Sequence, residues 1–424
     1  MMLDFADLAV GPAPQLSLEA FQRRRERLAD QLEGALVVAT NPELTYSNDV
    51  EHRFRPHSDF WYLTGFAEPG AVLVLDEAGR TTLFCRARDA KAEVWTGRRL
   101  GVERAAGALG VDRVHPMDEL GEVLPRLVGK QTYQITEHNP EVAETLANHA
   151  PSSDPGADLL AEMRLRKEPA EVELLRKACD VGAAAMREAL PLARPGAFEY
   201  EVEAALLRHY RASGSTGPGY PAIVGAGANA AVLHYIENRD AIRAGDLVLV
   251  DAGCEWGYYN SDITRTVPSD GRFSDDHADL YRLVHEAQRA ALAKVAPGNT
   301  LQQVHEAAAK VLTDGFVARG WMKEDDGADG TRRFFMHGTS HYLGLDVHDA
   351  GRYKIDGASR KLEPGMVITV EPGLYLNPNF TDLPPGLDPL GIRIENDVVV
   401  TDDGHDDLLA GLPNDLDGVE GLLQ

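Results

Sequence analysis

Two segments of the sequence end in an acidic residue in the same way. Gly245 and Gly365 each open an apolar, largely β-branched run, and at the same spacing these runs reach Asp251 and Glu371. Such a run predicts a buried strand. Because a carboxylate is costly to bury unless it is paired or bound to a cation, two carboxylates at matching strand ends indicate one shared polar site.

Each run is followed by a second acidic residue. Asp251 precedes a predicted turn and then Asp262, and a hairpin here would place the two aspartates on adjacent strands. Glu371 is followed by Glu395, and alternation along a strand puts Arg393 on the same face as Glu395. Four converging carboxylates would repel one another in a partly dry site, so divalent cations are their natural neutraliser.

Histidines gather just before the second run. His337 and His341 have the spacing of a zinc-protease helix, but Gly338 stands where the catalytic Glu would be, and the glycines of the segment disfavour a helix. We therefore reject that interpretation. One imidazole added to four carboxylates makes an oxygen-rich site for two metals, which suits Mn²⁺ better than ions that prefer thiolates.

Any one of these residues also has an ordinary structural explanation. A single His is more often a core or surface residue, and an Asp at a strand end more often belongs to a turn or cap. Their joint occurrence in two matched segments favours a functional site. We interpret Cys254, Trp256 and Tyr259 as packing residues beside it.

The elements that must position these residues are predicted to repeat. Two pairs of helices, each with a Pro-Gly between its members, are expected at residues 169–190 and 198–213, and at residues 275–295 and 300–319. Strands that contain one of the matched runs follow each pair. This order predicts a duplicated α+β unit with its site between the halves.

The first part of the chain reads as a smaller α/β domain. It has a predicted helix at residues 17–34 and predicted strands at residues 35–39, 71–75, 81–85 and 133–136. Residues 151–156 have the composition of a linker. We therefore predict domains at residues 1–155 and 156–424, as expected for a chain longer than the ~250–300 residues that one core supports.

Composition excludes several classes of partner. The 67 acidic and 42 basic residues give a net charge of −25, which would repel nucleic acid and anionic membranes. The 3 cysteines have no C-x-x-C spacing, so neither a disulfide framework nor a thiolate metal site is expected. The sequence has no signal-peptide pattern and no apolar run of ~18 residues, so we expect a cytoplasmic protein.

The motifs around these residues closely resemble those of the bacterial Xaa-Pro aminopeptidases (aminopeptidase P) of the pita-bread metallopeptidase family. The resemblance lies in residues 251–253, 261–266, 337–349, 370–375 and 391–395, and in residues 47–49, 58–66 and 95–101 of the first domain. It implies a pita-bread C-terminal domain, in which a pseudo-twofold duplicated unit forms a curved antiparallel sheet with outer helices. A smaller α/β creatinase-like domain would precede it.

The resemblance also implies roles for individual residues. The ligands of two divalent ions per chain, Mn²⁺ first with Co²⁺ or Zn²⁺ as alternatives, would be Asp251, Asp262, His341, Glu371 and Glu395, with Asp262 and Glu395 bridging. The substrate-holding and catalytic positions would be His234, His337, His348, Tyr375 and Arg393. Creatinase and non-catalytic relatives lack the full ligand set, which this chain retains.

The implied activity is release of the first residue from peptides with proline second, by attack of a metal-bridging hydroxide. Glu371 would shuttle the proton, and His341 or His348 would stabilise the oxyanion. A prolidase restricted to X-Pro dipeptides and a non-catalytic peptide-binding scaffold remain alternatives. A homo-oligomer, dimer or tetramer, is expected, in which Asp49 and Trp95 help to bound a site.

Overall fold

The computed structural model describes residues 16–129, 131–136, 138–147 and 155–424, and the chain divides into two compact units. One unit ends at Arg164 and the other begins at Leu165. Arg164, in helix α7 (Pro155–Leu165), forms an ion pair of 2.8 Å with Asp59 of α2 (Ser58–Thr64). This pairing ties α7 to the first unit, so the units divide later than the boundary predicted after residue 155. The predicted linker begins outside the described residues.

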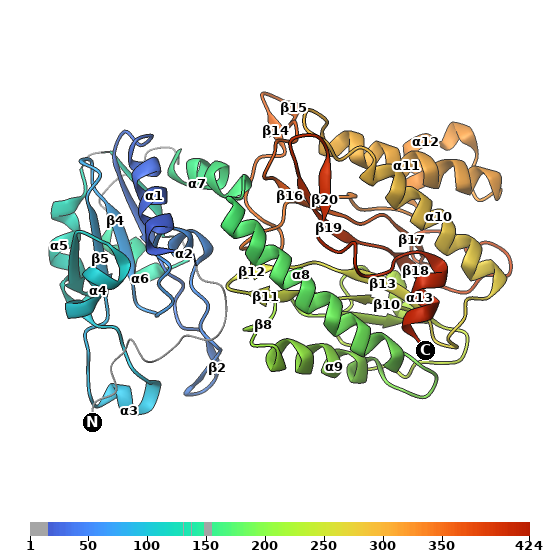
Figure 1. Cartoon of the computed structure of the whole chain (residues 1–424), viewed down its shortest axis with the longest axis horizontal. Helices are drawn as coiled ribbons and strands as arrows, with labels where there is room; N and C mark the ends of the chain where they lie inside the picture. The colour runs from blue at the N-terminus through green and yellow to red at the C-terminus, as the bar shows by residue number, and fades with distance from the viewer. Residues whose placement is uncertain (1–15, 130, 137, 148–154) are drawn as a thin grey trace. The chain divides into compact units, whose positions relative to one another are not determined.

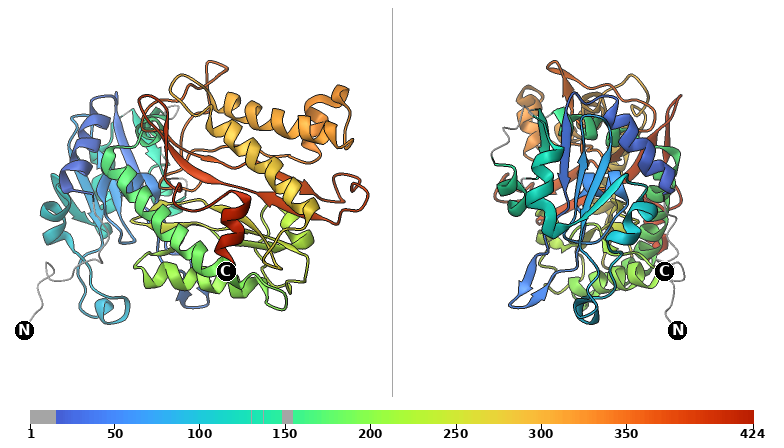
Figure 2. Two further views of the ribbon diagram at one scale, coloured as in Figure 1. Left: turned by 45° about the vertical axis from the view of Figure 1, so that its right-hand side comes forward. Right: turned by 90° about the vertical axis from the view of Figure 1, so that its left-hand side faces the viewer.

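In the described part of the first unit, five strands form one sheet in the order β6-β5-β4-β1-β7 (Figure 1; Figure 2, right). These strands are β1 (Ala35–Ala39), β4 (Val72–Leu75), β5 (Thr81–Cys85), β6 (Arg113–Pro116) and β7 (Thr132–Ile135). The pairs β1–β4 and β4–β5 are antiparallel, whereas β1–β7 and β5–β6 are parallel. The predicted strands are confirmed, two of them shifted by one residue.

The first unit also contains helices, most of which cover this sheet. They are α1 (Leu18–Ala29), α2, α3 (Ala92–Thr96), α4 (Val102–Leu109), α5 (Leu120–Leu127) and α6 (Pro140–Thr145), and a small hairpin joins β2 (Thr45–Ser47) to β3 (Val50–Glu51). Val37 of β1 packs in one cluster with Leu124 of α5 and Val142 of α6, while α2 also contacts β1 and β4. Every residue of β1 is therefore buried, which explains its uninterrupted apolar sequence. The helix predicted at residues 17–34 is confirmed but ends at Ala29.

The second unit contains two helix pairs and two matched sets of strands (Figure 1). Helix α8 (Pro169–Ala189) packs against α9 (Glu199–Ala212), and α10 (Asp275–Leu292) packs against α11 (Leu301–Ala318). After the first pair, β10 (Leu247–Asp251) runs antiparallel to β13 (Thr264–Pro268), and after the second, β16 (Val367–Val370) runs antiparallel to β19 (Asn396–Val400). The duplicated order predicted from the sequence is confirmed.

Local sequence explains where these elements begin. Pro169 opens α8 behind a capping box formed by Glu168 and Glu171, as expected for a residue without an N–H. Gly245 and Gly365, which open the two matched runs, have φ angles of +85° and +87°. A residue with a Cβ would be strained in that conformation, so the paired glycines mark the same turn in both halves.

The second unit contains further strands and helices. They are β8 (Gly217–Pro218), β9 (Ile223–Ala226), β11 (Cys254–Trp256), β12 (Tyr259–Asn260), β14 (Lys354–Ile355), β15 (Ala358–Ser359), β17 (Gly373–Leu376), β18 (Leu390–Arg393), β20 (His405–Asp407), α12 (Gly327–Arg332) and α13 (Leu416–Leu422). No helix in the described residues is long and apolar enough to cross a membrane.

Candidate active site

The first two acidic residues meet where β10 and β13 pair. Asp251 is the last residue of β10 and pairs with Thr264, and Asp262 lies just before β13. The predicted hairpin is thus only partly right, because β11 and β12 intervene as part of a separate sheet. A Cβ on Gly253 would lie 1.8 Å from the carbonyl oxygen of Ser261, so only glycine lets these two backbone segments approach.

The second two acidic residues occupy the corresponding place in the other half. Glu371 directly follows β16 and Glu395 directly precedes β19, whose first residue pairs with the last residue of β16. Arg393 ends β18, so the single strand predicted to carry both Arg393 and Glu395 is interrupted between them. Thr264 Oγ1 nevertheless joins the two side chains, because it accepts from Arg393 Nε at 3.2 Å and donates to Glu395 Oε2 at 2.6 Å.

His341 lies on an extended segment beside β16, not on a helix, which agrees with rejection of the zinc-protease helix. Its carbonyl oxygen accepts from Thr369 N, and its own N–H donates to Thr369 Oγ1. On the ring, Nδ1 lies 3.0 Å from the Tyr342 carbonyl oxygen and donates to it. This leaves Nε2 facing Asp262 at 3.4 Å and Glu371 at 3.5 Å, as an imidazole ligand must be arranged.

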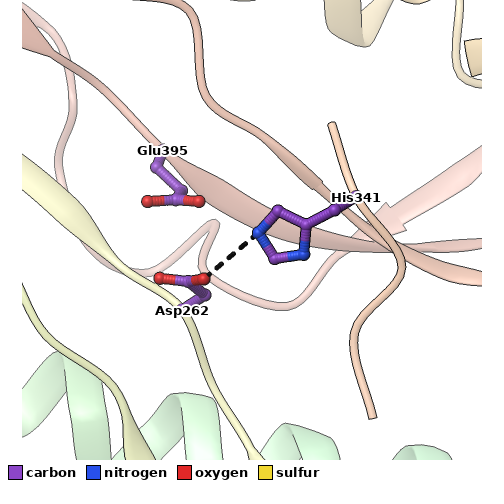
Figure 3. Close-up of side chains that lie close together, drawn as sticks. All are labelled: Asp262, His341 and Glu395. Carbon is purple, nitrogen blue, oxygen red and sulfur yellow. Dashed lines mark ion pairs between the residues drawn. The ribbon is translucent and has the colours of Figure 1, made fainter. Parts of the chain in front are cut away.

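All five residues predicted as metal ligands come together. Asp262, His341 and Glu395 each offer a donor atom, and these atoms lie within 4.8 Å of one another (Figure 3). Asp251 joins them through the Tyr220 hydroxyl, which lies 2.6 Å from Asp251 Oδ1 and 2.5 Å from Asp262 Oδ1. Glu371 joins through His341. The donor set of four carboxylates and one imidazole suits divalent cations.

The electrostatics of this cluster also fit bound cations. Burial raises the pKa of Glu371 to about 7 and, together with the charge of Asp262, raises the pKa of Glu395 well above its ordinary value. Burial would lower the pKa of His341, but Asp262 and Glu371 outweigh it and raise that pKa to about 9. A cluster that retains protons this strongly carries excess negative charge, which metal ions can neutralise.

A chain of hydrogen bonds extends from the cluster to His337. Arg393 donates to Asp251 Oδ2 at 2.5 Å and to the Tyr375 hydroxyl at 2.8 Å, and Tyr375 in turn donates to His337 Nε2 at 2.7 Å. The other ring nitrogen of His337 donates to the Gly338 carbonyl oxygen. Burial and the nearby Arg393 lower the pKa of His337 to about 3, so this imidazole is neutral and its 3.7 Å approach to Glu371 is not an ion pair.

A cavity of about 550 Å³ opens over these groups. His348 stands edge-on to His341, with ring centroids 4.5 Å apart, and burial and His341 lower its pKa. His234 and His337 also line the cavity. Apolar wall residues are Pro221, Ile223, Leu233, Ile236 and Val347. The predicted catalytic and substrate-binding residues therefore border this cavity, directly or, for Tyr375, through its hydrogen bond to His337.

Three residues that form hydrogen bonds to the cluster were not predicted from the sequence. Tyr220 lies in a segment without periodic pattern, so no sequence signal identifies it. Thr264 is two positions from Asp262, and alternation along a strand could have placed both on one face. Asp397 stands in the same relation to Glu395, and its Oδ2 accepts from the Asp262 backbone N–H at 2.8 Å.

Comparison with known proteins agrees with this geometry. Residues 173–402 match the model of metallopeptidase family M24, and residues 21–136 match the aminopeptidase P N-terminal domain. The chain is 40% identical to the Xaa-Pro aminopeptidase of Escherichia coli (strain K12), with 96% of this chain and 98% of that relative covered.

Solved structures show the same likeness over both units. The proline aminopeptidase P II of Yersinia pestis matches with a TM-score of 0.92 and 40% identity, over 96% of this chain and 99% of that chain. The zinc-substituted aminopeptidase P of Escherichia coli in complex with product matches with a TM-score of 0.92 and 39% identity, over 96% and 98%. The chain therefore belongs to metallopeptidase family M24 and carries the aminopeptidase P N-terminal domain.

Proposed function

We propose that this protein is a metal-dependent Xaa-Pro aminopeptidase that releases the first residue from peptides with proline in second place. The observation that carries this proposal is the convergence of five predicted ligands at one cavity in a chain of family M24. Relatives that are named Xaa-Pro aminopeptidase match nearly the whole chain.

The metal site is proposed to hold two divalent cations. Its ligands would be Asp251, Asp262, His341, Glu371 and Glu395, with Asp262 and Glu395 shared between the ions. The hard carboxylate donors favour Mn²⁺, with Co²⁺ and Zn²⁺ as alternatives. Bound divalent cations of this kind lower the pKa of a coordinated water towards neutrality and polarise the scissile carbonyl.

Glu371 is the proposed carrier of the proton. In hydrolysis the water oxygen joins the carbonyl carbon of the first residue, the C–N bond to proline breaks, and one proton must reach the prolyl nitrogen. A carboxylate beside the attacked carbonyl can accept this proton and then donate it. Its place between His341 and His337 puts it beside both the cluster and the cavity.

The histidines are proposed to divide the remaining work. His348 lies on the cavity side of His341 and would donate to the carbonyl oxygen as negative charge develops there. His337 is held neutral by the chain through Tyr375 and Arg393, so it offers an uncharged ring surface to the proline. His234, which also lines the cavity, would hold the substrate.

Selectivity for proline follows from the substrate itself. The prolyl nitrogen has no N–H and its ring fixes φ, so enzymes that require this donor bind X-Pro bonds poorly, whereas a cavity shaped for the ring selects them. The test is kcat/KM with Mn²⁺ for X-Pro, X-Pro-Y and X-Ala-Y peptides. We expect X-Pro-Y to be cleaved far faster than X-Ala-Y.

The other outcomes identify the alternatives. Turnover confined to X-Pro dipeptides would make the protein a prolidase. Comparable turnover of X-Ala-Y would contradict proline selectivity. Binding of X-Pro-Y without turnover, in protein whose metal content has been verified, would indicate a peptide-binding scaffold.

We further propose a homo-oligomer. The first unit exposes large apolar side chains near its β2–β3 hairpin, at Leu44, Tyr46 and Val50, and on α3, where Trp95 is 87% exposed. Apolar side chains exposed in this way favour contact with another protein surface. We propose that a second copy covers Trp95 and that Trp95 and Asp49 bound its cavity. Light scattering of Trp95→Ala should show loss of the oligomer, and an unchanged mass would contradict this role.

A further inference from the structure

His234 lies on a loop without regular secondary structure. Residues 232–240 form no helix or strand, yet His234 and Ile236 both line the cavity. Irregular segments open more readily than strands or helices unless buried contacts fix them. A residue that must hold a substrate from such a loop therefore needs an anchor.

The strongest anchor is a buried carboxylate on another element. Glu199 is the first residue of α9, and its side chain is 0% exposed. Its Oε1 accepts from the Ala226 N–H at 2.8 Å and from Asn229 Nδ2 at 3.0 Å. Its Oε2 accepts from the Tyr235 hydroxyl at 2.8 Å and from the Asp240 N–H at 2.9 Å.

These four hydrogen bonds use both oxygens fully. An ionised carboxylate offers about four acceptor positions, and here each oxygen receives two donors. The first turn of α9 adds a favourable dipole for the negative charge. Two of the donors, Ala226 and Asn229, precede the loop, and the other two, Tyr235 and Asp240, are its middle and its last residue. The carboxylate therefore joins the loop and the segment before it to α9.

The hydrogen bond from Tyr235 orients its neighbours. The Tyr235 ring is buried in a cluster with Ile223, Leu249 and Tyr375 and does not line the cavity. His234 and Ile236, one residue to either side, line the cavity instead. Burial and Glu199 raise the pKa of Tyr235 to about 12, so its hydroxyl stays a donor.

A second contact fixes the far end of the loop without replacing Glu199. Asn238 is buried and has a φ of +47°, and its side chain donates to the Ala222 carbonyl oxygen and accepts from the Val224 N–H. Asn238 thus binds the loop to β9. Glu199, in contrast, binds the side chain of Tyr235, the residue next to His234.

We propose that Glu199 is a positioning residue, whose buried carboxylate fixes the 232–240 loop so that His234 keeps its place in the cavity. This inference rests on the proposed peptidase function, since it assigns Glu199 to the substrate side of that site. The residue acts through His234 and touches neither substrate nor metal ligand.

Glu199→Gln is the sharpest variant. Glutamine has nearly the same volume, but its amide presents one acceptor oxygen and one donor NH₂ group. The NH₂ group would face two of the four donors, so the variant removes the charge and breaks one side of the anchor. The variant Asp76→Asn serves as a matched control. Asp76 is a buried carboxylate of the first unit that accepts from the Ala78 and Arg80 N–H groups.

The kinetic test is a double-mutant cycle with X-Pro-Y and Mn²⁺. We expect Glu199→Gln to lower kcat/KM by a factor of ~10–100 with unchanged metal content. In a His234→Ala background, Glu199→Gln should change kcat/KM by less than about threefold, because the side chain that Glu199 positions is already absent. Asp76→Asn should leave kcat/KM near the parent value. Equal losses from Glu199→Gln in both backgrounds would overturn the proposal.

A second measurement needs no turnover. In Zn²⁺-loaded protein labelled at histidine, the His234 ring signal is identified by its disappearance in His234→Ala. Glu199→Gln should shift and broaden this signal, and Asp76→Asn should not. An unchanged His234 signal in folded Glu199→Gln protein would overturn the positioning role. If the parent protein fails to cleave X-Pro-Y, the proposed function fails, while this measurement still decides the inference.

A milder variant covers the case in which Glu199→Gln does not fold. Tyr235→Phe removes one hydroxyl and keeps the ring in its cluster. It should lower kcat/KM by a factor of ~2–10 and shift the His234 signal in the same direction. An effect of Tyr235→Phe that is equally large in the His234→Ala background would contradict the proposal.

Discussion

The two halves of the second unit place their acidic residues alike but give the neighbouring position to different side chains. In the first half, β9 runs antiparallel to β10, and the residues just before it bring the Tyr220 hydroxyl between Asp251 and Asp262. In the second half, the corresponding side of β16 is occupied by the extended segment that carries His341. One half thus supplies a phenol hydroxyl to the cluster and the other an imidazole ring.

This difference separates two roles within one duplicated frame. The shared features, the glycine-opened strands and the acidic residues at their ends, place four carboxylates together. The features that differ supply the proposed nitrogen ligand, His341, and most of the side chains that are proposed to face the substrate. The halves also hold each other, because Arg393 of the second half donates to Asp251, and Thr264 of the first half donates to Glu395. Duplication thus accounts for the four carboxylates, and the differences between the halves account for the side chains around them.

The largest expected effect is loss of metal and activity when a bridging residue is replaced. Each half has one such proposed residue, Asp262 in the first and Glu395 in the second. Asp262→Ala or Glu395→Ala should remove both metals and all activity, since two cations without their shared anion repel each other. Metal analysis of the purified variants checks this. Full occupancy in either variant would refute the proposed ligand set, and loss in only one would show that the halves are not equivalent.

The next effect separates two histidines that both come from the second half. His341→Ala should lower metal content, whereas His348→Ala should keep the metal and lower kcat by a factor of ~10²–10⁴. Metal content and kcat measured on the same preparations give the comparison. Equal metal loss in both variants would contradict the proposed division between ligand and substrate-facing residue.

The duplicated features could be predicted from the sequence, whereas the features that differ between the halves mostly could not. Gly245, Asp251, Gly365 and Glu371 repeat along the chain, so the strands, the duplication and the acidic residues were predictable. The insertion of β11 and β12 was not, because it breaks the hairpin without changing the apolar pattern.

Residues that hold the cluster across the chain leave even less signal. Tyr220 reaches two aspartates that follow it by tens of residues, and Glu199 fixes a loop from a separate helix. Such contacts depend on the packing of distant segments, whereas local periodicity reports only which face of an element is buried. Family resemblance supplied the roles of His234 and Arg393, which local pattern alone did not.

A smaller effect tests the phenol of the first half. Tyr220→Phe removes a hydroxyl that contacts Asp251 and Asp262, so the affinity for metal should fall by a factor of ~10–100. Tyr375→Phe is the matched control, because its hydroxyl lies in the same region but bonds to His337 and Arg393. Titration of metal-free protein measures both. Similar losses in the two variants would show that the Tyr220 contact has no special role.

The smallest expected effect is a pH dependence of stability in the metal-free protein, which distinguishes the histidine of the cluster from its neighbours. His341 has a folded-state pKa of about 9, raised from an ordinary 6.5. The stabilisation from this proton is therefore complete below pH 6.5 and is lost as the pH rises through 9. The pKa of His337 is lowered to about 3, so its contribution is present above pH 6.5 and is lost at acid pH.

These windows make the measurement specific. Glu371, with a pKa raised to about 7, titrates mainly below the range of pH 7 to 9. The pKa of Glu395 is also raised, but this residue is present in the parent and in His341→Gln, so the difference between the two proteins reports His341. The free energy of unfolding of chelator-treated protein should fall by about 1–3 kcal/mol across that range. His341→Gln should abolish most of this fall, and His348→Gln should retain it. If the free energy of unfolding falls as steeply with pH in His341→Gln as in the parent, the acidic residues do not stabilise a proton on His341. The proposed electrostatic difference between the imidazole and the Tyr220 phenol would then be wrong.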